Sequence, residues 1–241
     1  MQIIPIHIEK EIESSDDISK LIINSADLHD GDILVIAQKI ISKQEGRIID
    51  LSSVTPSLLA EGISSQYDKD PRIVELILSE SKRIVRMKNQ IIIVQTNHGF
   101  ICANAGVDES NVKNGYATLL PENSDISAKI IREKIKSNTN KNVAIIISDT
   151  FGRPFRMGQT NCAIGISGLG PLLDYAGTLD SFEKILRVTE IAVADEFSAA
   201  AELVMGKALK CPAVIIRDYS FNFGDHGISE LIRPETEDLF K

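Results

Sequence analysis

Residues 144–159, AIIISDTFGRPFRMGQ, place polar and charged side chains directly after a run of apolar residues. The apolar run is rich in isoleucine and is typical of a buried strand. Asp149 and Thr150 stand at the end of this strand, where proteins that mix strands and helices often bind ligands. Arg153 and Arg156 follow, and guanidinium groups bind carboxylates and phosphates through paired hydrogen bonds. The stretch therefore predicts a site that holds an anion.

A second carboxylate, Asp108, also follows an apolar strand. Together with Asp149 and the Thr150 hydroxyl it supplies hard oxygen donors, which are the ligands that Mg²⁺ and Mn²⁺ prefer. Each aspartate taken alone could instead cap a turn or a helix, and each arginine could form a surface ion pair. Taken together, the groups favour a divalent metal beside a phosphorylated ligand, because phosphoryl transfer depends on such positioning and charge neutralisation.

Two lysines near glycines stand in polar clusters. Lys43 lies three residues before Gly46 in a polar segment that is expected to form a turn, and Lys207 follows Gly206. Lys43 could face a phosphate, although a lysine that faces solvent is the commoner arrangement. Ala208 follows Lys207, so the segment is not a P-loop, and the sequence also lacks the glycine pattern of a dinucleotide site and the nucleophile elbow of a hydrolase. The residues alone indicate an enzyme that binds a metal and an anion.

Composition excludes several classes of protein. Hydrophobic residues make up 43% and charged residues 25% of the 241 residues, as in ordinary globular proteins. The formal net charge of −8 argues against nucleic acid as a partner, since phosphate backbones need a basic face. No apolar run approaches the ~20 residues that span a membrane, and no signal peptide precedes the first strand. Three dispersed cysteines, at positions 102, 162 and 211, predict the cytoplasm and buried thiols.

The pattern of apolar residues predicts an α+β fold with mixed and antiparallel sheets and packed helices. The helix over residues 124–140 is the clearest, with Ile126, Ile130, Ile131 and Ile135 on one side. No linker marks a boundary, so residues 1–241 are expected to form one ligand-binding unit, with two interleaved lobes as an alternative. Strands are expected in 2–6, in 29–38 after a turn at Gly31, directly after a turn at Gly46, and in 82–87, 90–96, 100–106, 142–150, 161–171 and 211–219; the three between 82 and 106 are expected to form an antiparallel meander. Helices are expected in 15–26, with Ser15 as a candidate N-cap, in 55–81 as two pieces with Pro71 near the start of the second, in 124–140 and in 195–205, and a polar surface tail in 233–241.

The polar clusters resemble those of the coenzyme F420-0 gamma-glutamyl ligase family, in its single-domain form. The matching stretches are ISKQEGR, NAGVDESNV, SDTFGRPFRMGQTNCAIGISG, VADEFSAAAELVMGK and PAVIIRDY, and they run through nearly the whole chain. The resemblance implies a GTP-dependent ligase that joins L-glutamate to F420-0 through an acyl phosphate. It also implies Mg²⁺ or Mn²⁺, with K⁺ as a further ion, and a cytoplasmic, intertwined homodimer with sites near the subunit interface.

The same resemblance implies roles for the residues singled out above. By position, Asp108 and Asp149 match ligands of one metal, and Thr150 matches a ligand of a second metal. Asp149, Arg153 and Arg156 are the residues expected to act in catalysis. The stretches expected to contact the nucleotide contain Gln38, Lys39, Lys43, Asn111, Met205, Gly206 and Lys207.

One position departs from the family pattern. Some relatives carry an acidic residue after the Met-Gly pair that helps to bind the second metal, whereas this chain has Lys207. Since a protonated lysine cannot ligate Mg²⁺, the second metal is either held differently or replaced by the lysine. Two other functions stay open: a ligase of the same family that acts on a different carboxylate cofactor, and a non-catalytic module that binds a nucleotide or a deazaflavin.

Overall fold

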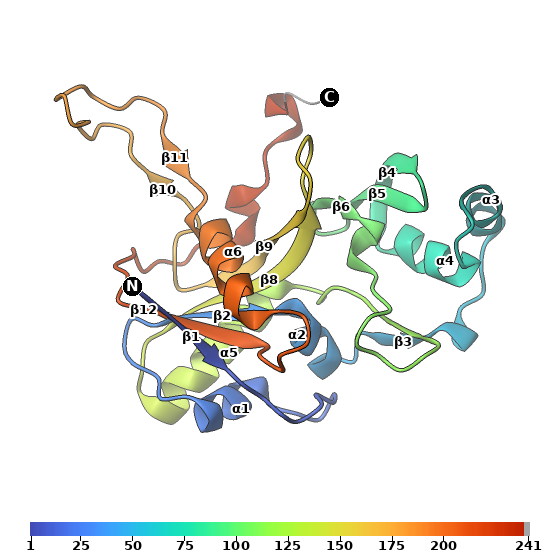
Figure 1. Ribbon diagram of the computed structural model, residues 1–241, viewed down its shortest axis with the longest axis horizontal. Coiled ribbons are helices and arrows are strands. Elements are labelled where there is room, and N and C mark those ends of the chain that lie inside the picture. Colours follow the sequence, from blue (N-terminus) through green and yellow to red (C-terminus); the bar gives the residue numbers. More distant parts are fainter. Residues whose placement is uncertain (239–241) are drawn as a thin grey trace.

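The computed structural model describes residues 1–238, so residues 239–241 of the predicted surface tail lie outside the described residues. A five-stranded sheet forms the centre of the larger part of the molecule (Figure 1). Only β2 and β8 are parallel neighbours, and the other three pairs are antiparallel. The strand order is β1 (Gln2–Ile6), β12 (Ala213–Arg217), β2 (Ile33–Ala37), β8 (Ala144–Gly152) and β9 (Gln159–Ser167).

The parallel pair explains why distant segments meet at one edge of this sheet. Ala37 at the end of β2 lies opposite Ser148 on β8. The next residue on β8 is Asp149, and the residues after β2 enter helix α2 (Gln38–Gln44) directly. Because parallel strands end at the same edge of a sheet, the first residues of α2 lie close to Asp149.

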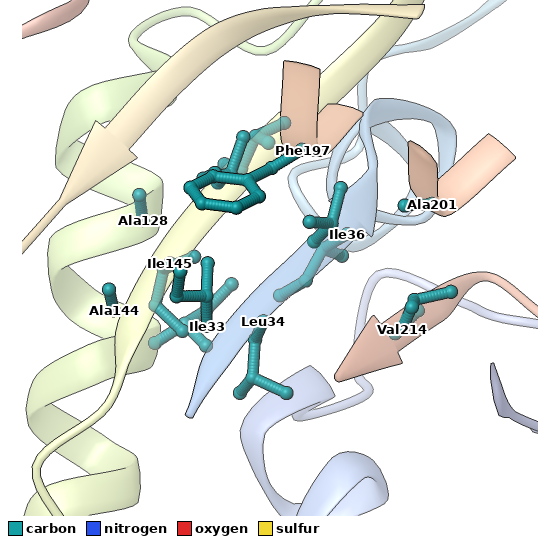
Figure 2. Packing of buried hydrophobic residues seen from close by; sticks show 14 of the residues in the cluster. Ile33, Leu34, Ile36, Ala128, Ala144, Ile145, Phe197, Ala201 and Val214 are labelled. Carbon is teal, nitrogen blue, oxygen red and sulfur yellow. The ribbon is translucent and has the colours of Figure 1, made fainter. Parts of the chain in front are cut away.

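Helices cover the central sheet and bury its isoleucine-rich strands. Helix α5 (Ser124–Thr139) packs against β8 and β9, and α6 (Val193–Met205) packs mainly against β9, β12 and β1. Figure 2 shows Ala128 of α5 and Phe197 of α6 packed around strand residues such as Ile33 and Ile145. Helix α1 (Ile18–Ser25) packs against α5, and its N-cap is Asp17. Burial of this kind supplies most of the stabilising free energy of a fold, at about 25 cal/mol per Å² of apolar surface.

The edge strand β9 is protected by two carboxylates. Asp195 in the first turn of α6 accepts a hydrogen bond from the backbone N–H of Ala163 at 2.8 Å. Asp125 in the first turn of α5 accepts one from Ile166 at 2.7 Å. Unpaired N–H groups on an edge strand invite association with other strands, so these bonds satisfy part of that edge.

A smaller lobe is formed by residues 48–119 around a separate hydrophobic cluster. The chain enters and leaves this lobe through two strands that pair with each other. Pro71 lies at the start of the second helix of the lobe, as predicted, and the three-stranded antiparallel meander is confirmed. The elements are β3 (Ile48–Asp50), α3 (Leu58–Tyr67), α4 (Pro71–Ser79), β4 (Ser81–Lys88), β5 (Ile91–Thr96), β6 (Ile101–Ala103) and β7 (Tyr116–Thr118).

Strands β10 and β11 pair at the base of an arm, residues 173–191, that extends away from the body in Figure 1. The arm was not predicted, because it has neither regular periodicity nor a core of its own. No helix within residues 1–238 combines the length and apolar character needed to cross a bilayer. The remaining elements are β10 (Leu173–Asp174), β11 (Glu190–Ile191) and the short 3-10 helices η1 (Leu51–Ser53), η2 (Asn104–Gly106), η3 (Ile228–Leu231) and η4 (Glu235–Glu237).

The predicted α+β class is confirmed, and three local predictions are wrong. Lys43, expected in the turn at Gly46, lies instead in helix α2, which forms because Ile40 and Ile41 pack into the main core, whereas the turn at Gly46 and the short strand after it are confirmed. On α5, Ile126 and Ile130 are 55% and 46% exposed, since the buried stripe is centred on Ala128, Ile131 and Ile135. The cap predicted at residue 15 for the first helix lies instead at residue 17.

Candidate active site

Asp149 lies partly buried near the end of β8, where the Gln38 side chain from α2 donates a hydrogen bond to it. Burial raises the pKa of Asp149 to about 6, with a further upward contribution from the Asp108 carboxylate. Hydrogen bonds from the Thr150 backbone and Gln38, and the charge of Lys39, act in the opposite direction. The negative charge at this strand end is therefore incompletely balanced.

Asp108 reaches the same place from the loop that follows η2. Lys39 Nζ lies 2.6 Å from Asp108 Oδ2 and 2.7 Å from Ser110 Oγ. Burial acts to raise the pKa of Asp108, but hydrogen bonds from Lys39 and Ser110 outweigh it and hold the pKa below its ordinary value. The structure thus brings together four of the predicted site residues from three separate segments.

These residues fit one Mg²⁺ or Mn²⁺ ion. Asp108 and Asp149 converge, and burial together with the Asp108 carboxylate keeps the pKa of Asp149 raised despite the charge of Lys39. A hard divalent cation would supply the missing positive charge. Within residues 1–238 there is no group of three or more His, Cys, Asp or Glu side chains able to hold a metal. Water and substrate oxygens would complete the coordination, as is usual for Mg²⁺.

Thr150 belongs to a different polar cluster, and its side chain does not join Asp149. Lys207 Nζ donates to Thr150 Oγ1 at 2.8 Å, and the hydroxyl in turn donates to Asn161 Oδ1 at 2.7 Å. Glu202 Oε1 lies 2.9 Å from Lys207 Nζ, and its other oxygen accepts from Asn161 at 3.1 Å. The lysine ammonium occupies the oxygen atoms that a cation would need, so these residues do not fit a second metal.

Glu202 and Asn161 were not among the predicted site residues. Asn161 lies opposite Thr150 in the β8–β9 ladder, and only the strand register reveals that pairing. Glu202 is a charged residue on a helix that is otherwise rich in alanine, which is the one feature of the sequence that could have indicated it. Both residues come to the site through tertiary contacts.

Lys43 and Asn111 line one cleft of about 570 Å³. Lys43 is only 7% exposed, lies in the last turn of α2 and forms an ion pair with Glu11. The alternative of a solvent-facing lysine is therefore wrong. Lys39 and Lys43 are four residues apart on α2 and so share one helix face, which directs the first toward the carboxylates and the second toward the cleft.

The two arginines of the β8–β9 hairpin lie apart from the carboxylates. They occupy the exposed tip, residues 153–158, and Arg153 donates to the backbone oxygen of Met157 at 2.8 Å. The strand continues to Gly152, so at about 3.3 Å per residue Arg153 at the start of the tip lies roughly 13 Å along the chain from Asp149. Neither Arg153 nor Arg156 forms an ion pair with any residue in 1–238. The charge of Arg153 nevertheless acts to lower the pKa of Cys162, the residue opposite Asp149, and an anion held by Arg153 and Arg156 stays a prediction.

The turn after α6 brings only one of its three predicted residues to the polar cluster. Met205 is 3% exposed and packs in the main core, which leaves only its backbone for a ligand contact. Gly206 ends the helix with φ +55° and ψ −174°, a conformation that a side chain would strain. The resulting change of direction is what carries Lys207 back toward Thr150.

The sequence of the chain was compared with known proteins. The family model described as F420-0:Gamma-glutamyl ligase matches residues 7–218. The chain belongs to this ligase family. Among similar members is the coenzyme F420:L-glutamate ligase of Methanothermobacter thermautotrophicus, which is 47% identical over 95% of this chain and 94% of the relative. The protein of the same name from Methanocaldococcus jannaschii is 47% identical over 89% of this chain and 86% of the relative.

A third ligase of the same name, from Methanopyrus kandleri, is 41% identical and covers 100% of this chain and 98% of its own length. The family resemblance inferred from the motifs is confirmed. The matches extend over the central sheet and the smaller lobe, so the family membership applies to the chain as a whole.

Proposed function

We propose that this protein is a GTP-dependent ligase that joins L-glutamate to F420-0 through an acyl-phosphate intermediate, in the biosynthesis of coenzyme F420. The observation that carries the proposal is the meeting of Asp108 and Asp149 beside Lys39, one helical turn from a cleft that contains Lys43. The names of the similar proteins support the choice of substrates.

The geometry supports a division of labour along α2. The cleft at Lys43 and Asn111 has the size to take a nucleoside triphosphate, and its lining carries two lysines, Lys43 and Lys113, against one carboxylate, Glu11, which is paired with Lys43. Asp108 and Asp149 would hold the Mg²⁺ or Mn²⁺ ion, which supplies charge neutralisation at the phosphates. Lys39 lies where it can contact the transferring phosphoryl group. K⁺ is proposed only as a further ion.

The reaction then proceeds in two steps. The carboxylate of F420-0 accepts the γ-phosphoryl group, and GDP leaves. The glutamate amine attacks the acyl carbon, the bond to the phosphate oxygen breaks, and the amine proton passes to a base or to water. Lys207 can contact a phosphate oxygen from the Thr150 side, which makes it a further candidate for stabilising the leaving phosphate.

A cytoplasmic homodimer is part of the same proposal. The arm exposes Leu179, Phe182, Ile185 and Val188, which are 61%, 82%, 64% and 91% accessible. An extended arm with such a surface fits burial against a second copy of the chain. The cytoplasmic location rests on the three cysteines, all of which are free thiols.

The two alternatives remain testable. A ligase of the same family with a different carboxylate substrate would use the same carboxylates and lysines. A non-catalytic binding module would not need two converging carboxylates, so the site geometry favours catalysis.

The deciding experiment incubates the protein with F420-0, L-glutamate, Mg²⁺ or Mn²⁺ and either GTP or ATP, followed by mass spectrometry. We expect a product heavier than F420-0 by whole glutamyl residues, formed with GTP and accompanied by GDP. Product with ATP alone would reject the nucleotide assignment. Product only from another carboxylate would favour the first alternative, and nucleotide binding without any product would favour the module.

A further inference from the structure

A second cavity, of about 330 Å³, lies between the two lobes and is distinct from the Lys43 cleft. Its walls come from the strands of the smaller lobe, the β8–β9 hairpin, the first turn of α6 and the C-terminal segment. We call it the Arg233 cavity. The lining residues used below are Arg83, Phe100, Phe151, Cys162, Asp195 and Arg233.

The Arg233 cavity adjoins the candidate reaction site. Cys162 lies directly opposite Asp149 in the β8–β9 ladder, so both side chains emerge on the same face of the sheet. Phe151, two residues after Asp149, shares that face and also lines the cavity. Burial raises the pKa of the Cys162 thiol to about 12, and the carboxylates of Asp195 and Asp149 add to this effect. Cys162 therefore lies close to both carboxylates.

The cavity is lined by one carboxylate at its inner end, Asp195, and by two arginines at its outer end, where the carboxylates of Glu235 and Asp238 also line it. At the inner end, Asp195 Oδ1 accepts from the Ala163 backbone at 2.8 Å, and no donor within residues 1–238 bonds to Oδ2. At the outer end, Arg233 has no ion pair with any residue in that range. Arg83 donates to Gln95 at 2.7 Å and makes a longer contact of 3.3 Å with Glu235, which a ligand carboxylate could replace.

We propose that the Arg233 cavity binds the amino-acid substrate of the ligase, an inference that rests on the proposed function. The ammonium group of the amino acid faces Asp195, and its carboxylates face Arg233 and Arg83. This orientation directs the amine toward Asp149, where it must approach the acyl carbon to about 3–3.5 Å.

The other substrate fits this cavity less well. A flat deazaflavin ring needs open apolar faces, but Phe100 and Phe151 contact each other edge to face, with ring centroids 6.0 Å apart. The volume lies at the small end of the roughly 300–1,000 Å³ usual for ligand sites. Paired charges of opposite sign match a zwitterion and not a ring.

The test compares Arg233→Gln and Asp195→Asn with two matched controls, Arg86→Gln on the same strand as Arg83 and Glu196→Gln beside Asp195. Neither control residue lines the cavity. Asp195→Asn keeps an acceptor for the Ala163 N–H, so the edge of β9 stays covered. Circular dichroism and thermal melting establish that each variant is folded.

Each variant is assayed for the KM of L-glutamate and of F420-0. We expect the KM of L-glutamate to rise about tenfold or more in both cavity variants, the size expected for loss of a charged hydrogen bond, while the KM of F420-0 changes less than about twofold. The controls should match wild type. A rise in the KM of F420-0 alone would assign the cavity to the deazaflavin substrate, and no change in either KM would overturn the proposal.

Calorimetry separates this inference from the proposed function. L-glutamate is titrated into wild type, Arg233→Gln and Arg233→Lys in the presence of F420-0 and a non-hydrolysable GTP analogue. We expect wild type to bind, Arg233→Gln to lose about tenfold in affinity and Arg233→Lys to recover part of it. If L-glutamate binds with this pattern but no ligation occurs, the proposed ligase function is rejected and the assignment of the cavity to the amino acid stands. If wild type ligates glutamate but Arg233→Gln binds L-glutamate as tightly as wild type does, the ligase function stands and the assignment of the cavity to glutamate is rejected.

Discussion

Asp149 and Thr150 are neighbours in the chain but belong to two different electrostatic environments. On the Asp149 face, two carboxylates meet, and within residues 1–238 Lys39 is the cation that pairs with them. On the Thr150 face, Lys207 and Glu202 neutralise each other and Asn161 completes a closed set of hydrogen bonds. Successive residues of a strand point to opposite faces, so one strand end presents carboxylates that fit a cation on one side and a cluster balanced by the Lys207 ammonium on the other.

The largest expected effect is on the Asp149 face. Asp149→Asn removes the charge that would hold the metal at the phosphates, so ligation should fall by roughly 10²–10³-fold in kcat. Product formation measured by mass spectrometry checks this, with circular dichroism as the control for folding. Turnover at the wild-type level would remove Asp149 from the mechanism.

A second prediction concerns the pH dependence of stability in the metal-free protein. Burial raises the folded-state pKa of Asp149 to about 6 from 3.8, so its contribution to stability is present below pH 3.8 and is lost as the pH rises through about 6. The free energy of unfolding of the wild type, measured relative to that of Asp149→Asn, should therefore rise by roughly 2–3 kcal/mol as the pH falls from about 7 to about 4. Urea unfolding of both proteins across this range measures the difference. A difference independent of pH would show that Asp149 is not desolvated.

A third prediction addresses the Thr150 face. If the Lys207 ammonium replaces a second metal, wild type should bind one Mn²⁺ per chain, and Lys207→Glu should bind a second one about tenfold more tightly than wild type does. Electron paramagnetic resonance of free Mn²⁺ gives the stoichiometry without reference to activity. Lys210→Glu, at a residue paired with Glu9 outside this cluster, is the charge-matched control. Two Mn²⁺ ions per wild-type chain would contradict the comparison.

The smallest effect is expected for Thr150→Val. The change removes hydrogen bonds to Lys207 and Asn161, so the free energy of unfolding should fall by about 1 kcal/mol while Mn²⁺ stoichiometry stays the same. Chemical denaturation and the same resonance experiment measure both quantities. A loss of bound Mn²⁺ would return Thr150 to the list of metal ligands.

Much of the fold could be predicted from the sequence, because the strands of the main sheet are short isoleucine-rich runs bounded by turns. The errors share one cause, which is that packing overrode local pattern. Helix α2 looks like a polar turn because only Ile40 and Ile41 anchor it, and Ile126 and Ile130 look buried because the apolar stripe of α5 is wider than the surface it covers. The arm contains too little regular pattern to be recognised.

By itself, the sequence determined the family and the α+β class and indicated Asp108, Asp149, Lys39 and Lys43 as candidate site residues, because these depend on residue types and on order along the chain. Only the tertiary structure decided which of these groups meet. The register of β8 with β9 set Asp149 and Thr150 apart, and opposed them to Cys162 and Asn161. The docking of helix α6 on the sheet brought Lys207, 57 residues further along the chain, to the Thr150 hydroxyl. Strand register and helix docking are non-local, so no spacing within the sequence records them.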